Sequence, residues 1–325
     1  MSKFSLDEIN VLDYCKADLV IICCSFESRS IELLKRFETT DKPIVVFYNK
    51  ESAGLFEENL KYVKSHIKYN YLTEISIDDP LFTVDRIIQT FDKFSSHNIN
   101  NVLLDITCFT HEALLIVLKV LSTIFNKVNI TCAYVNALDY SIGDNGNDKW
   151  LSRGISKIRS VLGYAGNIEP GKKTHLILIV GYEIDRAYAI INELEPNSIS
   201  IGYGKAEHAT AAKNKSSNEL YSNLLFATSA LYYDISRFEI RCNDPVSTAN
   251  SILEQAKKNQ DKNIIVVPLN NKLSTLGAAL AYEKNNNLQI CYAKALEYNI
   301  QNYSLPGDQV YIFSIADLIG SVTQE

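Results

Sequence analysis

The chain has 325 residues, of which 46% are hydrophobic and 22% are charged, and its formal net charge is −6. This length exceeds the usual size of one hydrophobic core, so we expect a globular protein with two domains. The acidic balance argues against nucleic acid as a partner, because neutralising phosphates requires a concentrated basic surface.

Neither a membrane span nor a secretion signal is indicated. The longest apolar run, 113–125, is interrupted by Lys119 and is shorter than the roughly 18 residues that a transmembrane helix needs. The first residues include Asp7, Glu8 and Asp13 instead of a basic and then apolar leader. We therefore expect a cytoplasmic protein without a membrane partner.

Metal and cofactor signatures are absent from the sequence. The seven cysteines form no CxxC pair and no Cys/His cluster, which argues against a zinc site and a disulfide framework. The GxGxxG and Walker A fingerprints are also missing. We expect no metal and no cofactor.

The first half of the chain alternates apolar strands with helices, as in a parallel sheet with right-handed crossovers. Asp79 followed by Pro80 is a strong helix-start signal, since Asp is a favoured N-cap and Pro suits the first helical position. Strands are expected at 19–24, 44–48, 71–75, 102–106 and 128–134, and helices at 28–37, 54–66, 81–94 and 111–125.

A linker and a second series of strands follow. The segment 143–173 is rich in Gly, Asn and Lys, and we expect a connecting helix near 150–162. Strands are expected at 176–180, 198–202, 237–241, 264–269, 288–293 and 310–313, with helices between them.

The two halves resemble one another. The strands at 20–24 and 176–180 both run into a turn with an aromatic residue, a Glu and an Arg, and Asp244-Pro245 repeats Asp79-Pro80. A repeat of about 160 residues implies folded domains. The expected fold class is α/β, with two tandem Rossmann-like domains related by internal duplication and with mainly parallel sheets. The expected domains are 1–145 and 174–325, joined by a linker at 146–173.

Polar residues follow the first strand of each half. In open α/β sheets, ligands bind at the carboxyl ends of the strands. Ser25, Glu27 and Arg29 lie there in the first half, and Glu183 and Arg186 in the second. Such a Glu and Arg suit a ribose hydroxyl and a phosphate, or the Glu serves as base or nucleophile, with Glu27 the catalytic candidate. The alternative is a local helix cap and its ion pair.

A second group follows the fourth strands. Thr107, Thr110 and His111 stand at the start of a helix in the first half, and Lys272 does so in the second. Hydroxyls and a Lys at a helix N-terminus favour binding of a phosphate or nucleobase. Tyr203, in a Gly-Tyr-Gly-Lys turn after the second strand of the second half, is a further ligand-binding candidate.

The segment 104–111 resembles the strand, Thr-x-x-Thr-Lys and helix element of CARF (CRISPR-associated Rossmann fold) domains, which sense cyclic oligoadenylates. Thr107 and Thr110 match the threonines, whereas His111 stands where those sequences often have Lys. The second half keeps Lys272 but has Asn270 and Asn271 in place of threonines. The resemblance implies a Rossmann-like sensor of a nucleotide ligand.

Three functions stay open. The leading hypothesis is a sensor or effector subunit that binds a nucleotide-like ligand, acts in bacterial antiviral defence and works with an effector protein. A nucleotide- or glycosidic-bond-cleaving hydrolase using Glu27 or Glu183 is the alternative, so whether the chain is an enzyme is undecided. A protein-interaction module is the third. For the first, we expect Lys272→Ala with Arg29→Ala to abolish binding while barely changing the melting temperature.

Overall fold

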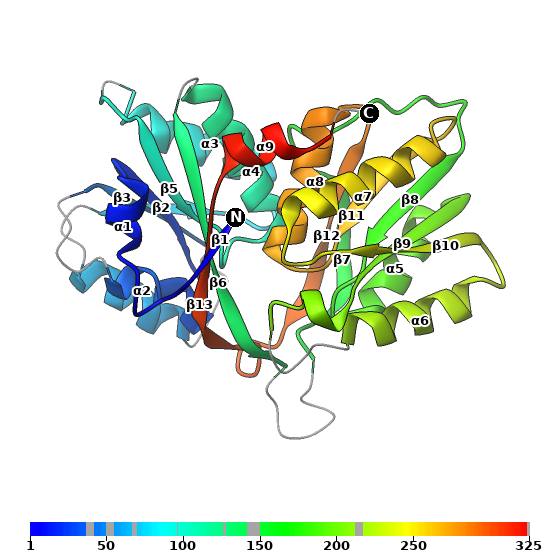
Figure 1. The fold of residues 1–325 in the computed structure, drawn as a ribbon, viewed down its shortest axis with the longest axis horizontal. Coiled ribbons are helices and arrows are strands. Elements are labelled where there is room, and N and C mark those ends of the chain that lie inside the picture. The colour runs from blue at the N-terminus through cyan, green and yellow to red at the C-terminus, as the bar shows by residue number, and fades with distance from the viewer. Residues whose placement is uncertain are drawn as a thin grey trace. The chain divides into compact units, whose positions relative to one another are not determined.

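The structure is a computed structural model that describes residues 1–36, 42–49, 55–66, 70–95, 97–125, 128–141, 150–211 and 217–323. It divides into two compact units (Figure 1). The first unit contains residues 1–139 and 303–317, and the second contains residues 140–302 and 318–325.

The first unit is built on a seven-stranded sheet with the order β1-β13-β6-β5-β2-β3-β4. Neighbouring strands from β6 to β4 pair in parallel, and β1 pairs antiparallel with β13. The strands are β1 (Ser2–Ser5), β2 (Leu19–Cys24), β3 (Ile44–Asn49), β4 (Asn70–Ile75), β5 (Asn101–Asp105), β6 (Asn129–Tyr140) and β13 (Ser304–Ser314).

Helices cover both faces of this sheet (Figure 1). One face carries α1 (Val11–Cys15), the 3₁₀ turns η1 (Ser28–Ile31) and η2 (Leu34–Arg36), and α2 (Leu55–His66), whereas α3 (Pro80–Asp92) and α4 (His111–Ile124) cover the other. The α-helix expected at 28–37 is wrong within the described residues, which form η1 and η2. The Ser30 hydroxyl donates to the carbonyl of Ser25 at 3.4 Å, a local bond of the kind that competes with regular helix.

The second unit has a six-stranded sheet with the order β10-β9-β8-β11-β12-β7. All neighbours pair in parallel except β12 and β7, which are antiparallel. The strands are β7 (Ser152–Ser160), β8 (Thr174–Ile179), β9 (Ser198–Gly204), β10 (Asp234–Ile240), β11 (Asn263–Pro268) and β12 (Gln289–Tyr298). The helices α5 (Ile184–Leu194) and α6 (Ser217–Ser229) cover one face, and α7 (Pro245–Lys258) and α8 (Lys272–Lys284) the other (Figure 1). The remaining elements are η3 (Ala206–His208) and α9 (Ile315–Ser321).

The two sheets follow the same plan. The order β4-β3-β2-β5-β6 matches β10-β9-β8-β11-β12 with the strands in the same chain order, as an internal duplication requires. The next position is filled by β13 in the first sheet and by β7 in the second. Asp79 caps α3 by accepting from the Phe82 amide at 3.0 Å, and Asp244 caps α7 by accepting from the Val246 amide at 3.0 Å. The predicted fold class, α/β with two Rossmann-like parallel sheets, is confirmed.

One strand of each sheet, β13 in the first and β7 in the second, comes from the opposite half of the chain. β7 follows β6 along the chain but pairs with β12, and β13 follows β12 but lies beside β6. The connecting helix predicted near 150–162 is therefore wrong, because β7 occupies that segment; positions 146–149 lie outside the described residues. The units also differ from the expected domains 1–145 and 174–325, since 303–317 belongs to the first unit.

Among the residues that the structure describes, no helix combines the length and the apolar character needed to cross a membrane.

A buried histidine in the second unit makes its stability depend on pH. His175 bonds Ser198 Oγ through Nδ1 at 2.8 Å and Ser200 Oγ through Nε2 at 3.0 Å. Burial, and then the charge of Lys262, lowers its pKa from the usual 6.5 to about 4. Protonation below pH 6.5 therefore favours the unfolded chain, and stability is lost as the pH falls toward 4.

We expect the wild type to lose about 2 kcal/mol more stability than His175→Gln between pH 7.5 and pH 5. Urea unfolding of the two proteins at both pH values measures this difference. If the free energy of unfolding of the two proteins changes equally with pH, this prediction is refuted.

Candidate functional site

Both sheets have a topological switch point, where the connections leave two adjacent strands in opposite directions. It lies between β2 and β5 in the first unit and between β8 and β11 in the second. Ligands of open α/β sheets bind in the crevice at such points, beyond the carboxyl ends of the strands. All of the predicted site residues except Tyr203 follow these four strands, and Tyr203 lies near the end of β9, next to β8.

In the first unit, Glu27 and Arg29 form a buried ion pair, with 8% and 3% of the side chains exposed. Arg29 Nε donates to Glu27 Oε2 at 3.0 Å, and its Nη2 donates to the same oxygen. Arg29 Nη1 also reaches the carbonyl of Val135 on β6 at 3.2 Å, and Ser304 Oγ on β13 donates to Glu27 Oε2 at 2.7 Å. The pair therefore ties the turn after β2 to β6 and β13.

The second unit repeats this arrangement. Arg186 pairs with Glu183 through Nη1 and donates through Nη2 to the carbonyl of Ala293 on β12. Ser152 Oγ on β7 donates to Glu183 Oε1 and accepts from Arg186 Nη1 at 3.0 Å. Ser152 thus takes the place of Ser304, and Ala293 takes the place of Val135.

This repeated network favours the local, structural interpretation of the two Glu–Arg pairs. Each carboxylate already accepts hydrogen bonds from an arginine and a serine of its own unit. Because Arg29 is buried and paired, we expect its removal to destabilise the fold. This replaces the expectation that the variant with both Lys272→Ala and Arg29→Ala keeps its melting temperature.

Asp105, the last residue of β5, and Thr107 form a second buried cluster. Asp105 accepts from the Thr107 amide at 2.9 Å and from the Thr107 hydroxyl, while the Val135 amide donates to Thr107 Oγ1 at 3.0 Å. Burial raises the pKa of Asp105 to about 6, opposed by the bonds from Thr107 and by the charge of Arg29. Burial also raises the pKa of the neighbouring Cys108 thiol well above its usual value, so this cysteine is not an activated nucleophile. Thr107 therefore bonds within the protein.

The accessible predicted residues of the first unit are Ser25, Thr110 and His111, all half-buried. Thr110 is the N-cap of α4, where its Oγ1 accepts from the Ala113 amide at 3.1 Å, and His111 is the first residue of that helix. Ser25 Oγ accepts from the Glu27 amide at 3.0 Å. These side chains place hydroxyl and imidazole groups at a helix N-terminus, whose dipole attracts anions.

At the switch point of the second unit, the backbone after β8 lies in close contact with the backbone after β11. A Cβ added at Gly181 would lie 2.3 Å from the carbonyl oxygen of Leu269, so only glycine fits there. Asn270 Nδ2 donates to the carbonyl of Val180 at 2.7 Å, which joins the same two loops.

Accessible polar groups of the second unit lie beside these loops. Lys272 is the half-buried first residue of α8, and Asn271 caps that helix by accepting from the Ser274 amide at 2.9 Å. Asn271 Nδ2 also donates to Thr210 Oγ1 at 3.2 Å, which links α8 to the loop after β9. Near the end of β9, the half-buried Tyr203 ring stacks with the Arg237 guanidinium, 4.5 Å from the ring centroid.

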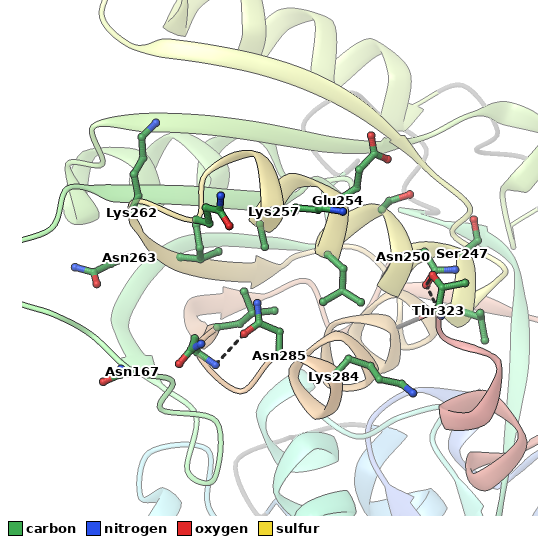
Figure 2. Close-up of a pocket in the computed structure, with 18 of the residues that line it drawn as sticks. Asn167, Ser247, Asn250, Glu254, Lys257, Lys262, Asn263, Lys284, Asn285 and Thr323 are labelled. Atoms are coloured by element: carbon green, nitrogen blue, oxygen red, sulfur yellow. Dashed lines mark hydrogen bonds between the residues drawn. The ribbon is translucent and has the colours of Figure 1, made fainter. Parts of the chain in front are cut away.

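A polar groove of about 1210 Å³ lies elsewhere on the second unit (Figure 2). Its lining extends along α7 from the N-cap Asp244 to Lys257 and includes the C-terminal end of α8 and the first residues of β11. Four lysines and three carboxylates line it, which leaves its charge nearly balanced: Lys172, Lys257, Lys262, Lys284, Glu169, Asp244 and Glu254. Charge alone therefore selects no ligand class for this groove.

Sequence reasoning missed Ser304 and Ser152, which complete the two Glu–Arg networks. Ser304 lies 277 residues from Glu27, and Ser152 lies 31 residues before Glu183. Neither serine belongs to a motif, and only the exchange of β7 and β13 between the sheets brings them to the glutamates.

Comparison with known proteins gives matches among solved structures only. No family model and no curated protein matches the chain. One solved match is a type III CRISPR defence DNA nuclease activated by cyclic oligoadenylate, with 7% identity and a TM-score of 0.49, covering 81% of this chain and 63% of the nuclease. Another is the binary complex of leucoanthocyanidin reductase with NADPH from Vitis vinifera, with 7% identity and a TM-score of 0.26, covering 83% and 88% of the two chains.

The chain spans less than two thirds of the nuclease's length. Both TM-scores lie below 0.5, and the function of the chain must therefore be argued from its own residues.

Proposed function

We propose that this protein is a sensor subunit that binds nucleotide-like anionic ligands, with one candidate site at the carboxyl edge of each sheet. The observation that carries the proposal is the placement of accessible donors at equivalent helix N-termini: Thr110 and His111 on α4, and Lys272 on α8. Both helices follow the strand beside a switch point. A helix dipole together with hydroxyl, imidazole and ammonium donors suits phosphate groups.

The two Glu–Arg networks have a supporting role in this proposal. Glu27 and Arg29 fix the turn that carries Ser25, and Glu183 and Arg186 fix the start of α5. Ser25, Thr107, Glu27, Arg29, Glu183 and Arg186 would thus shape the two ligand edges. Thr110 and His111 contact a ligand at the first sheet, and Tyr203 and Lys272 contact one at the second. Tyr203 supplies an aromatic face for a base.

A sensor subunit requires a partner protein to produce a response to ligand binding. One surface of the second unit suits the binding of such a partner. Apolar side chains of α6 and the turn after it are exposed: Leu220 (56%), Leu224 (47%), Leu231 (81%) and Tyr232 (81%). Exposed apolar side chains gathered on one helix and the turn after it are typical of protein-interaction sites. We propose that these residues bind the effector partner, in a role within antiviral defence.

The ligand proposal predicts a specific loss on Lys272→Ala. We expect this variant to bind the ligand at least about tenfold more weakly, because a charge-assisted contact to a phosphate is lost. The measurement is a thermal-shift screen of cyclic oligoadenylates, linear oligoadenylates, ATP and NAD, followed by calorimetric titration of the nucleotide that stabilises the protein. Cyclic oligoadenylate comes first, since it activates the nuclease found among the solved structures.

Lys284→Ala is the matched control, because Lys284 is the half-buried last residue of the same helix. We expect it to leave nucleotide affinity unchanged. Equal losses in both variants would indicate only a general charge effect. A screen in which no nucleotide raises the melting temperature would contradict the sensor proposal and favour the interaction module.

A further inference from the structure

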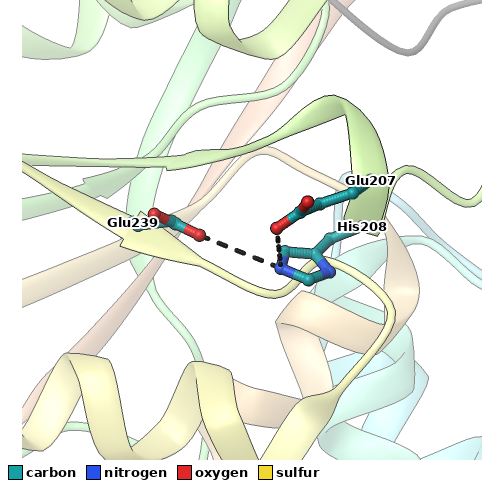
Figure 3. A group of neighbouring side chains, drawn as sticks. All are labelled: Glu207, His208 and Glu239. Carbon is teal, nitrogen blue, oxygen red and sulfur yellow. Dashed lines mark ion pairs between the residues drawn. The ribbon is translucent and has the colours of Figure 1, made fainter.

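Three potential metal ligands converge at the carboxyl edge of the second sheet (Figure 3). Glu207 and His208 lie in η3, directly after β9, and Glu239 lies near the end of the neighbouring strand β10. His208 Nε2 is 3.2 Å from Glu207 Oε1 and 3.8 Å from Glu239 Oε1, and all three ligand atoms lie within 4.8 Å of one another. Tetrahedral ligands about 2.0–2.2 Å from a zinc ion are separated by roughly 3.3–3.6 Å, which lies between the two separations measured from His208.

The surroundings orient two of these ligands. Lys205 Nζ lies 2.6 Å from Glu239 Oε2, so the lysine holds one carboxylate oxygen while the other, Oε1, faces His208. The His208 amide donates to the carbonyl of Lys205 at 3.0 Å, which fixes the turn that carries the imidazole. An outer partner that orients a ligating group is a regular feature of metal sites.

Burial and charge also suit a cation. His208 is 16% exposed and Glu239 is 37% exposed, whereas Glu207, at 69%, lies at the open side of the group. With a neutral imidazole, the two carboxylates and Lys205 leave one net negative charge at this position. One imidazole nitrogen and two carboxylate oxygens match zinc and similar first-row divalent ions better than magnesium or calcium, which prefer oxygen ligands.

We propose that Glu207, His208 and Glu239 bind one divalent transition-metal cation of the Zn²⁺ type. Sequence analysis gave no sign of this site, because the ligands come from two segments and form no recognised spacing. The proposal rests on the positions of these side chains and is independent of the proposed nucleotide ligand.

The test is calorimetric titration of Zn²⁺ alone into chelator-treated full-length protein, with no nucleotide present. We expect binding of one Zn²⁺ per chain, weakened at least about tenfold in His208→Gln and in Glu207→Gln, since each removes a direct ligand. His97→Gln is the control: His97 is exposed and lies in the first unit, remote in sequence from the proposed ligands, so its loss should leave this affinity unchanged.

A second readout distinguishes a site from loose association. Co²⁺ in place of Zn²⁺ should give a visible absorption band in the wild type and in His97→Gln, and no such band in His208→Gln. The proposal is overturned if the wild type binds no Zn²⁺, or if His208→Gln and Glu207→Gln bind it as tightly as the wild type. Because Glu207 is largely exposed, its variant should keep the native fold, and circular dichroism confirms this for each protein.

Discussion

Arg29→Ala is expected to lower the free energy of unfolding of the first unit by about 3–5 kcal/mol, the usual cost of breaking a buried ion pair by removing one partner. The variant leaves Glu27 buried beside Ser304 without its cation, and it frees the carbonyl of Val135. Chemical denaturation followed by circular dichroism measures the loss, and hydrogen exchange at β2 and β6 locates it.

Lys35→Ala is a suitable control, because Lys35 is 41% exposed and its ion pair with Glu32 is a surface pair. Such pairs contribute about 0–1 kcal/mol, so this variant should unfold almost like the wild type. Similar stabilities of Arg29→Ala and Lys35→Ala would show that the Glu27–Arg29 pair does not hold the turn after β2 in place.

Cutting the chain between β6 and β7 is expected to leave both fragments unable to fold alone. The fragment 1–149 lacks β13, which lies between β1 and β6 in the first sheet, and the fragment 150–325 carries β13 without that sheet. An unpaired strand edge promotes aggregation. We expect each fragment to be insoluble when expressed singly and the two to copurify as a soluble pair when coexpressed.

Soluble, monomeric fragments with native circular dichroism would contradict this prediction. An uncut chain carrying an inserted flexible linker within 142–149 serves as the control, since it keeps the connection between the strands while changing the same segment. Its solubility should equal that of the wild type.

The central parallel strands were predictable because they are nearly continuous apolar runs, as buried parallel strands require. Leu19–Cys24 of β2 is buried throughout, and Thr174–Ile179 of β8 is buried after its first residue. The strand β7 was not predictable in the same way. Its sequence, Ser-Arg-Gly-Ile-Ser-Lys-Ile-Arg-Ser, is mostly half-buried or exposed, because an antiparallel edge strand has one solvated side.

The sequence predicts where the polar residues of the candidate site lie in the fold better than it predicts what their side chains contact. Polar residues after strands identify the carboxyl edge of a sheet from sequence alone. Whether a side chain faces a ligand or its own protein depends on distant partners, as Arg29 and Arg186 show: each bonds a carbonyl more than 100 residues away. The cluster of Glu207, His208 and Glu239 was missed for the same reason, since β10 brings its third member from a separate segment.

The exchange of β7 and β13 between the sheets also has a consequence for synthesis on the ribosome. β7 is made before the rest of its sheet, so the second sheet can close as soon as β12 emerges. The first sheet must wait for β13, and Glu27 must wait for Ser304, 277 residues later. At about 5–20 residues per second, this delay is on the order of tens of seconds. The N-terminal unit should therefore finish folding last, reversing the order in which the two units leave the ribosome.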